Sequence, residues 1–250
     1  MEFQAGSFAV AVTVPDRAVL EHNMRDRFAR GQGFALATLN LDHLEKLRAE
    51  GPFRDAYAAQ EFVTADGNPI VWCAALAGRS VELLPGSDLI LPLARIAAGM
   101  GVAVGLVGST EDSLAGATEA LERAVPGLRV VERIAPPMGF DPDGDTARAV
   151  LNRLDAAGVG LCFLALGAPK QERLAALGRQ VTPGIGFASI GAGLDFLSGK
   201  QARAPEWVRR IAMEWAWRML SDPRRMARRY ILSALILPGH LWRSWRMRQR

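Results

Sequence analysis

The chain has 250 residues, half of them apolar, and a formal net charge of +4 at pH 7. This length and apolar content exclude a disordered chain and allow one sizeable domain with an appendage. The two cysteines and three histidines lack the spacing of a disulfide framework or of a histidine metal centre, so we expect reduced, buried thiols and no metal or other cofactor.

Short apolar runs alternate with amphipathic segments over residues 1–199. This rhythm is typical of βαβ units and predicts an α/β fold, with a Rossmann-like, mainly parallel sheet flanked by helices. In chain order, the expected strands are residues 8–14, 34–39, 102–107, 128–134, 160–166 and 184–190. The expected helices are residues 16–30, 41–50, 87–99, 111–125 and 146–157, with further helix starts near Asn68 and Pro169.

The composition changes near Gly199, where we place a domain edge. Residues 1–199, the predicted α/β domain, carry a net charge of −6, whereas residues 200–250 contain 13 Lys and Arg against 3 Asp and Glu. Five of the six tryptophans also lie in this basic segment. We therefore expect residues 200–250 to form a basic, Trp-rich, helical C-terminal appendage.

Cationic side chains interleaved with tryptophan suit the boundary between anionic headgroups and acyl chains. The apolar stretch from Tyr230 supplies eight residues before Pro238 interrupts it, whereas a spanning helix needs about 20. The appendage is thus expected to lie on a membrane surface without crossing it. A solvated or partner-binding tail and a nucleic-acid-binding tail stay open. The N-terminal residues lack the basic and then apolar pattern of a secretory signal, which favours a cytoplasmic protein.

Polar turns follow several expected strands, at the edge where parallel α/β sheets bind ligands. Thr38 and Asn40 end one strand, and Asp66 lies just before a helix. Gly108 opens a Gly-Ser-Thr turn that would suit a phosphate, and Gln171 lies near a helix start. Taken singly, each has a simpler role: Asn40 as a helix cap, Asp66 as a turn residue and Gln171 as a solvated side chain.

Their joint occurrence is more specific, because seven motifs appear in a fixed order. The motifs are Thr38-Leu39-Asn40-Leu41-Asp42-His43-Leu44, Thr64-Ala65-Asp66-Gly67-Asn68-Pro69, Pro85-Gly86-Ser87-Asp88-Leu89, Pro136-Pro137-Met138-Gly139-Phe140, Gly167-Ala168-Pro169-Lys170-Gln171-Glu172, Gly191-Ala192-Gly193-Leu194-Asp195-Phe196 and Arg203-Ala204-Pro205-Glu206-Trp207. Together, from about residue 14 to residue 229, they resemble the WecG/TagA/CpsF family of bacterial glycosyltransferases.

The resemblance implies transfer of a sugar from a UDP-activated donor to a saccharide carried on polyprenyl diphosphate, for cell-surface polysaccharide synthesis. In that family the transfer inverts the anomeric centre and uses no bound metal. For this chain it implies a catalytic domain in residues 1–199 and a peripheral location on the inner face of the cytoplasmic membrane. The appendage would dock on that membrane and close over the active site.

By the same resemblance, Asp66 would be the general base that takes the proton of the acceptor hydroxyl. The donor would be bound by Thr38, Asn40, Gln171 and Asp195. Other residues expected near the substrates are Gly67, Asn68, Gly108 and Phe140. The departing diphosphate gains negative charge, which three arginines of the appendage would offset: Arg218, Arg225 and Arg228.

Two positions depart from the family pattern. Leu39 replaces the usual Pro but keeps both polar neighbours. Leu83 lies where members commonly have an arginine, and Arg79 is a candidate replacement. Because an anion contact is lost at Leu83, the departure bears on the sugar more than on the reaction. The donor stays open between UDP-N-acetylmannosamine, its uronic acid and a UDP-hexose.

An alternative function is a basic membrane- or nucleic-acid-associated nucleotide-binding protein without transferase activity. Nucleic acid is disfavoured, because the tryptophans accompany an apolar octet and not a base-stacking platform. A dehydrogenase would carry GxGxxG after its first strand, but residues 8–17 contain no glycine. The acidic run from Asp141 to Asp145 fits a turn better than a metal site. The oligomeric state, including a homo-oligomer, stays open.

Overall fold

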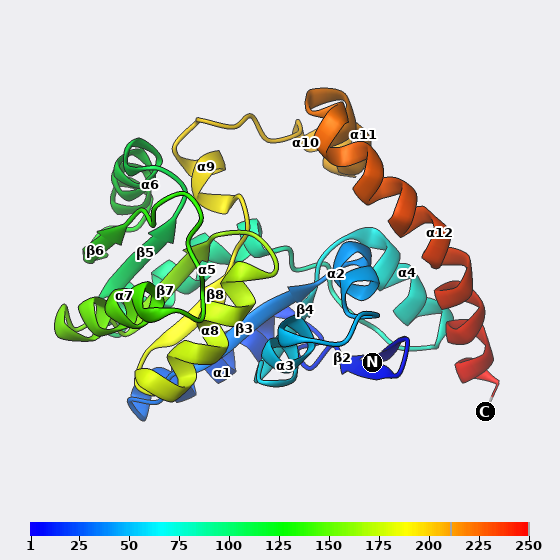
Figure 1. Ribbon diagram of the computed structural model, residues 1–250, viewed down its shortest axis with the longest axis horizontal. Coiled ribbons are helices and arrows are strands. Elements are labelled where there is room, and N and C mark those ends of the chain that lie inside the picture. The colour runs from blue at the N-terminus through cyan, green and yellow to red at the C-terminus, as the bar shows by residue number, and fades with distance from the viewer. Residues whose placement is uncertain (211, 250) are drawn as a thin grey trace.

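The computed structural model describes residues 1–210 and 212–249, apart from the side chains of Arg209 and Arg225. Its centre is a six-stranded parallel sheet in the order β4-β3-β8-β7-β5-β6 (Figure 1). The strands are β3 (Phe34–Leu39), β4 (Phe62–Ala65), β5 (Val104–Gly108), β6 (Val130–Ile134), β7 (Leu161–Ala165) and β8 (Gly186–Ser189). The expected α/β fold is confirmed, and a long C-terminal helix is added to it.

Two details of the strand prediction were wrong. The segment expected as a first sheet strand forms β2 (Phe8–Ala11), which pairs antiparallel with β1 (Glu2–Ala5) in a separate hairpin. The short strand β4 was not predicted, because four residues are too few to show a period. The hairpin therefore packs beside the sheet, and β4 takes the sheet edge next to β3.

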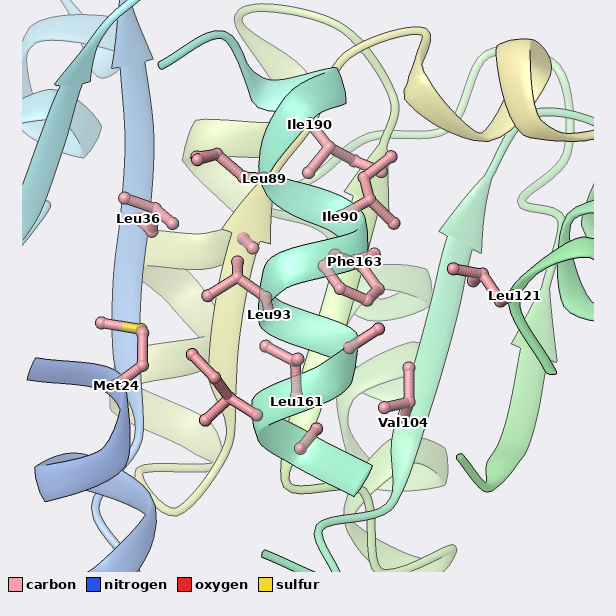
Figure 2. Packing of buried hydrophobic residues seen from close by; sticks show 14 of the residues in the cluster. Met24, Leu36, Leu89, Ile90, Leu93, Val104, Leu121, Leu161, Phe163 and Ile190 are labelled. Atoms are coloured by element: carbon pink, nitrogen blue, oxygen red, sulfur yellow. The ribbon is translucent and has the colours of Figure 1, made fainter. Parts of the chain in front are cut away.

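Helices cover both faces of the sheet, since its strands alternate their side chains between two apolar layers. One layer combines α1 (Arg17–Ala29), α5 (Gly86–Gly99) and α6 (Glu111–Ala124) with strand residues such as Leu36 and Phe163. Figure 2 shows Leu89, Ile90 and Leu93 of α5 among these strand side chains. The opposite layer packs α7 (Asp145–Ala156) and α8 (Lys170–Val181) on the alternate strand positions.

A third apolar cluster includes residues from the second halves of β3 and β4. It joins the β1–β2 hairpin to α2 (Leu41–Lys46), α3 (Pro52–Ala58) and α4 (Asn68–Leu76). Cys73 belongs to this cluster and Cys162 to the layer under α7 and α8. Both thiols are free and buried, as expected from the sequence.

The C-terminal segment continues through α9 (Gly193–Leu197), α10 (Glu206–Arg210), α11 (Glu214–Ser221) and α12 (Pro223–Arg248). Figure 1 shows α12 running along α2 and α4 at one end of the molecule. Helix α12 passes through Pro238 as one helix, so this residue ends the apolar stretch without ending the helix. No helix in the described part of the chain is long and apolar enough to cross a bilayer.

The face of α12 that packs on the rest of the chain combines polar and apolar side chains. Ser233, His240 and Ser244 are buried there, and the His240 ring lies 6.3 Å from that of Phe3. Arg243 donates to the carbonyl of Gln4 at 3.4 Å. Ile236, Leu237 and Leu241 add apolar contacts to the third cluster, so the helix is anchored along its length, while other large apolar residues of α12 are exposed.

Candidate active site

A cavity of about 740 Å³ lies at the carboxyl ends of the strands. Its lining comes from the ends of β3, β4, β7 and β8, the start of α5, and segments from α9 to α12. The strand order breaks at β3, which has its sequence neighbour β4 on one side and the last strand, β8, on the other. Such a break at the carboxyl edge is where open α/β sheets bind ligands.

Four expected site residues meet on the side of the cavity built by the sheet, which we call the sheet side: Thr38, Asn40, Asp66 and Gln171. Asp66 lies at its centre. Its Oδ2 accepts hydrogen bonds from Asn40 Nδ2 at 3.1 Å and from Thr38 Oγ1 at 3.4 Å. Its own backbone N–H donates to the carbonyl of Leu39 at 2.8 Å, which ties the turn after β4 to β3.

Asn40 performs two tasks with one amide. Its Oδ1 caps α2 by accepting from the backbone N–H of His43 at 3.0 Å, while its Nδ2 holds Asp66. The simpler role as a helix cap and the expected place in the site are therefore both present. Since the cap fixes the amide, the carboxylate of Asp66 is oriented before any ligand arrives.

Burial raises the pKa of Asp66 above its ordinary value. The hydrogen bond from Asn40 and the positive charges of Arg218 and Arg229 act in the opposite direction. A carboxylate with a raised pKa is a stronger base than one in water. The environment of Asp66 therefore makes it a better proton acceptor than an aspartate in water.

Gln171 connects two loops of the sheet side. Its Oε1 accepts from the backbone N–H of Gly191 at 3.1 Å, and its Nε2 donates to Glu172 Oε1 at 2.8 Å. Glu172 is fully buried, and its Oε2 has no hydrogen-bond partner among the described residues. Burial raises the pKa of Glu172 to about 7. The amide of Gln171 is thus fixed by a carboxyl group whose charge is poorly solvated.

His43 also borders the cavity, although no role was predicted for it. Its Nδ1 lies 2.7 Å from the carbonyl oxygen of Thr38 and 3.0 Å from the hydroxyl of Tyr57. The Tyr57 hydroxyl donates to the same carbonyl at 2.7 Å. The Thr38 carbonyl, behind the sheet side, therefore accepts from the buried Tyr57 hydroxyl and lies within hydrogen-bond distance of His43 Nδ1.

Three arginines line the opposing part of the cavity, which we call the C-terminal side: Arg203, Arg218 and Arg229. Each pairs with one carboxylate: Arg203 with Asp88, Arg218 with Glu214 at 2.8 Å, and Arg229 with Asp42 at 3.3 Å. The guanidinium carbons of Arg203 and Arg218 also lie 6.0 and 5.6 Å from the ring centroid of Phe196. Two lysines that line the same cavity, Lys46 and Lys200, add to its positive charge.

Of the three arginines predicted from the sequence, only Arg218 is seen to line the cavity. Arg228 is exposed and does not, and the side chain of Arg225 lies outside the described part of the structure. Arg229 and Arg203 were not singled out. On α12, Met226 and Arg229 line the cavity at a spacing of one helical face, and a shift of one residue turns Arg228 about 100° away from it.

The remaining expected residues lie around the cavity and do not line it. Gly67 and Asn68 start α4 directly after Asp66. Phe140 is packed in the apolar layer under α7 and α8. Asp195 accepts from the hydroxyl of Ser109, in the turn after β5. Gly108 leaves no room for a side chain, because a Cβ there would lie 2.4 Å from the carbonyl oxygen of Ala165 on β7.

The structure also shows where Leu83 lies, the residue at the position where an arginine was expected. Leu83 forms a bridge to Ala65 at the edge of the sheet and does not line the cavity. Arg79 is exposed, and its charge acts on the N-terminal amine, so it is not a cavity residue either. Arg203 is the cation that the structure brings to the start of α5, through its pair with Asp88.

The acidic run before α7 serves a local role. Asp143 pairs with Arg173, and its backbone N–H donates to Asp141 at 3.2 Å. Within the described residues, no group of three His, Cys, Asp or Glu is arranged to hold a metal ion. The run therefore acts as a turn tied to α8, as its Pro and Gly residues indicated.

The match to known families covers the domain and its C-terminal segment together. The model of the glycosyl transferase WecG/TagA/CpsF family matches residues 7–250. Family membership makes the protein an enzyme that uses a sugar donor and an acceptor, and it sets aside the alternative without transferase activity. On the strength of this match over nearly its whole length, the chain belongs to the WecG/TagA/CpsF family of glycosyltransferases.

Proposed function

We propose that the protein is an inverting glycosyltransferase that moves a sugar from a UDP-sugar to a saccharide carried on polyprenyl diphosphate, at the inner face of the cytoplasmic membrane. The observation that carries this proposal is one cavity with a single oriented carboxylate of raised pKa, Asp66, and three arginines on another side. An inverting displacement needs one base and a site for the departing anion. The cavity supplies both.

In this mechanism, Asp66 accepts the proton of the acceptor hydroxyl while the hydroxyl oxygen bonds to the anomeric carbon. The bond between that carbon and the diphosphate oxygen breaks, and UDP leaves with the electron pair. Thr38 and Asn40 keep Asp66 in place through its Oδ2. Because both hydrogen bonds favour the charged form, they also keep the base ionised before it takes the proton.

The arginines of the C-terminal side would stabilise the departing diphosphate. A guanidinium group offers paired donors that match phosphate oxygens, and it keeps its charge at any pH of interest. Arg203 would supply the contact that members of the family obtain from an arginine at the position of Leu83. In this chain the anion would then be held between the start of α5 and the helices α11 and α12.

The outer face of α12 is the proposed membrane contact. Ile231, Leu235, Trp242 and Trp245 are all between about half and three quarters exposed and follow one another at helical spacing. Arg246 lies over the Trp242 ring, with its guanidinium carbon 4.8 Å from the centroid. Exposed indoles flanked by arginines suit an interface with anionic lipid. Docking there would bring the cavity to the plane of a lipid-linked acceptor.

The direct test is a donor and acceptor screen in the presence of a chelator. UDP-N-acetylmannosamine, its uronic acid and UDP-glucose would each be mixed with a short-chain prenyl-diphosphate-linked saccharide, and UDP release and product anomer would be measured. Release of UDP from one donor with an inverted product is expected. A product of retained configuration, or activity only with an added divalent metal, would contradict the proposal.

A further inference from the structure

His43 is a buried polar group at the cavity that the proposed mechanism does not use. Its side chain is only 4% exposed, yet it borders the cavity together with Asp42, Lys46 and Arg229. Its ring meets those of Phe53 and Tyr57 edge to face, with centroids 5.9 and 5.8 Å away. The imidazole is thus held in one orientation, and its function depends on which nitrogen carries the proton.

The partners of Nδ1 decide that question. A carbonyl oxygen can only accept, so the contact of 2.7 Å with Thr38 requires a hydrogen on Nδ1. A neutral imidazole has one N–H, which leaves Nε2 with a lone pair. Because Nδ1 is taken up by the Thr38 carbonyl on β3, we assign Nε2 as the ring nitrogen that is available to the cavity.

The surroundings keep this imidazole neutral. Burial lowers the pKa of His43 to about 4. The charged groups around it are Asp42, which raises the pKa, and Arg229 and Lys46, which lower it; the Thr38 carbonyl raises it as well. Tyr57, on α3, stays protonated because burial raises its pKa. No group that faces His43 therefore favours its charged form strongly enough to offset burial.

The carboxylate whose charge acts on His43 is already occupied. Asp42 pairs with Lys46 at 2.7 Å and with Arg229 at 3.3 Å. None of the hydrogen bonds found among the described residues uses His43 Nε2. Nε2 would therefore offer a fixed, uncharged acceptor to a hydroxyl group of a ligand. The neighbouring cations, Lys46 and Arg229, could bind the oxygen atoms of the same ligand.

We propose that Nε2 of His43 accepts a hydrogen bond from a hydroxyl of the bound sugar, which makes His43 a positioning and specificity residue for the transfer. The inference rests on the proposed function, because it takes the ligand to be a sugar. A site that pairs a buried acceptor with a hydroxyl discriminates against sugars that lack or invert that hydroxyl. His43 would thus help to choose among donors or acceptors of similar size.

Two substitutions separate this role from a structural one. His43→Asn can keep a donor toward the Thr38 carbonyl but has no atom at the position of Nε2, whereas His43→Gln can place an oxygen there and loses the inner donor. We expect His43→Asn to keep the melting temperature near that of the parent while kcat/KM falls about 3- to 10-fold, as for one lost neutral hydrogen bond. His43→Gln should retain more of kcat/KM despite lower stability. The reverse order of activities would overturn the proposal.

A spectroscopic measurement tests the same point without turnover. In full-length protein labelled with ¹⁵N-histidine, the His43 signals should show a protonated Nδ1 and an unprotonated, neutral Nε2 from pH 5.5 to 8. A protonated Nε2 in the free protein would overturn the proposal. The assignment of these signals to His43 is confirmed if they are absent from the spectrum of His43→Asn.

Ligand titrations then identify the source of the hydroxyl. A shift of the Nε2 resonance with a UDP-sugar but not with UDP assigns it to the donor, and a shift with the short-chain prenyl-diphosphate saccharide assigns it to the acceptor. Binding of both ligands by calorimetry without any Nε2 shift would overturn this proposal alone. Absence of binding by every UDP-sugar and by the acceptor would overturn the proposed function together with it.

Discussion

The two sides of the cavity hold their polar groups in different ways. On the sheet side, Asp66 is fixed by Thr38 and Asn40, which are themselves anchored to β3 and α2. On the C-terminal side, each arginine is held by one carboxylate, and their side chains keep between 24% and 37% of their surface exposed. Partly exposed ion pairs contribute little to stability. The Asp66 carboxylate is therefore preorganised, whereas the arginines can exchange a carboxylate for a phosphate at small cost.

Removing the base should have the largest effect. Asp66→Asn keeps the size of the side chain but cannot accept a proton, so kcat should fall by roughly two to four orders of magnitude while UDP affinity stays nearly the same. Initial rates and calorimetry with UDP would measure the two quantities. Activity at the parent level would remove Asp66 from the mechanism, and a matched loss of UDP binding would point to a damaged cavity.

Substitutions on the C-terminal side should act on binding of the anion. Arg229→Ala and Arg203→Ala should each weaken UDP binding about 10-fold or more, as expected for charge-assisted hydrogen bonds. Arg228→Ala is the matched control, since Arg228 has the same charge one residue away on α12 and does not line the cavity. Equal losses in Arg228→Ala and Arg229→Ala would show that general charge, and not the cavity lining, attracts the nucleotide.

The buried carboxyl under the sheet side predicts a pH-dependent stability. The pKa of Glu172 is about 7 in the folded protein and 4.5 in the unfolded reference. The contribution of this carboxyl group to the free energy of unfolding is therefore fully present below pH 4.5 and is lost as the pH rises through 7. Glu172→Gln keeps an acceptor for Gln171 and removes the charge. The variant should therefore be more stable than the parent at pH 8, by about 1–3 kcal/mol, with little difference at pH 4.5. Urea unfolding at both pH values would measure this, and a variant destabilised at pH 8 would contradict it.

The outer face of α12 should show the smallest effect per residue. Trp242→Ala or Trp245→Ala should lower binding to anionic vesicles several-fold and leave UDP affinity unchanged, because neither indole lines the cavity. Trp72→Ala, on exposed α4, serves as a control for loss of an exposed indole outside the C-terminal segment. Co-sedimentation with vesicles of mixed neutral and anionic lipid would rank the variants; unchanged binding of both α12 variants would remove this face from the proposed contact.

The sequence predicted the parallel sheet and most of its strands, because each buried strand is a short apolar run between turn residues. It also predicted the turns after β3, β4 and β7, since Asn40, Asp66 and Gln171 are polar groups at strand ends. It did not predict β4 itself or the separate hairpin. A segment of four residues is too short to show a hydrophobic period, and local sequence does not specify which strands pair.

Local sequence and the family resemblance together determined that this protein is an α/β glycosyltransferase with a basic, Trp-bearing C-terminal segment and a carboxylate at Asp66. Only the tertiary structure decided which of the described cations line the same cavity as that carboxylate. The rotation of α12 selects Arg229 over Arg228, and the path after α9 brings in Arg203. It also placed the Thr38 carbonyl against the His43 ring and buried that ring, the two observations from which we infer its protonation state. The lining of the cavity arises from distances between segments far apart in the chain, which no local pattern encodes.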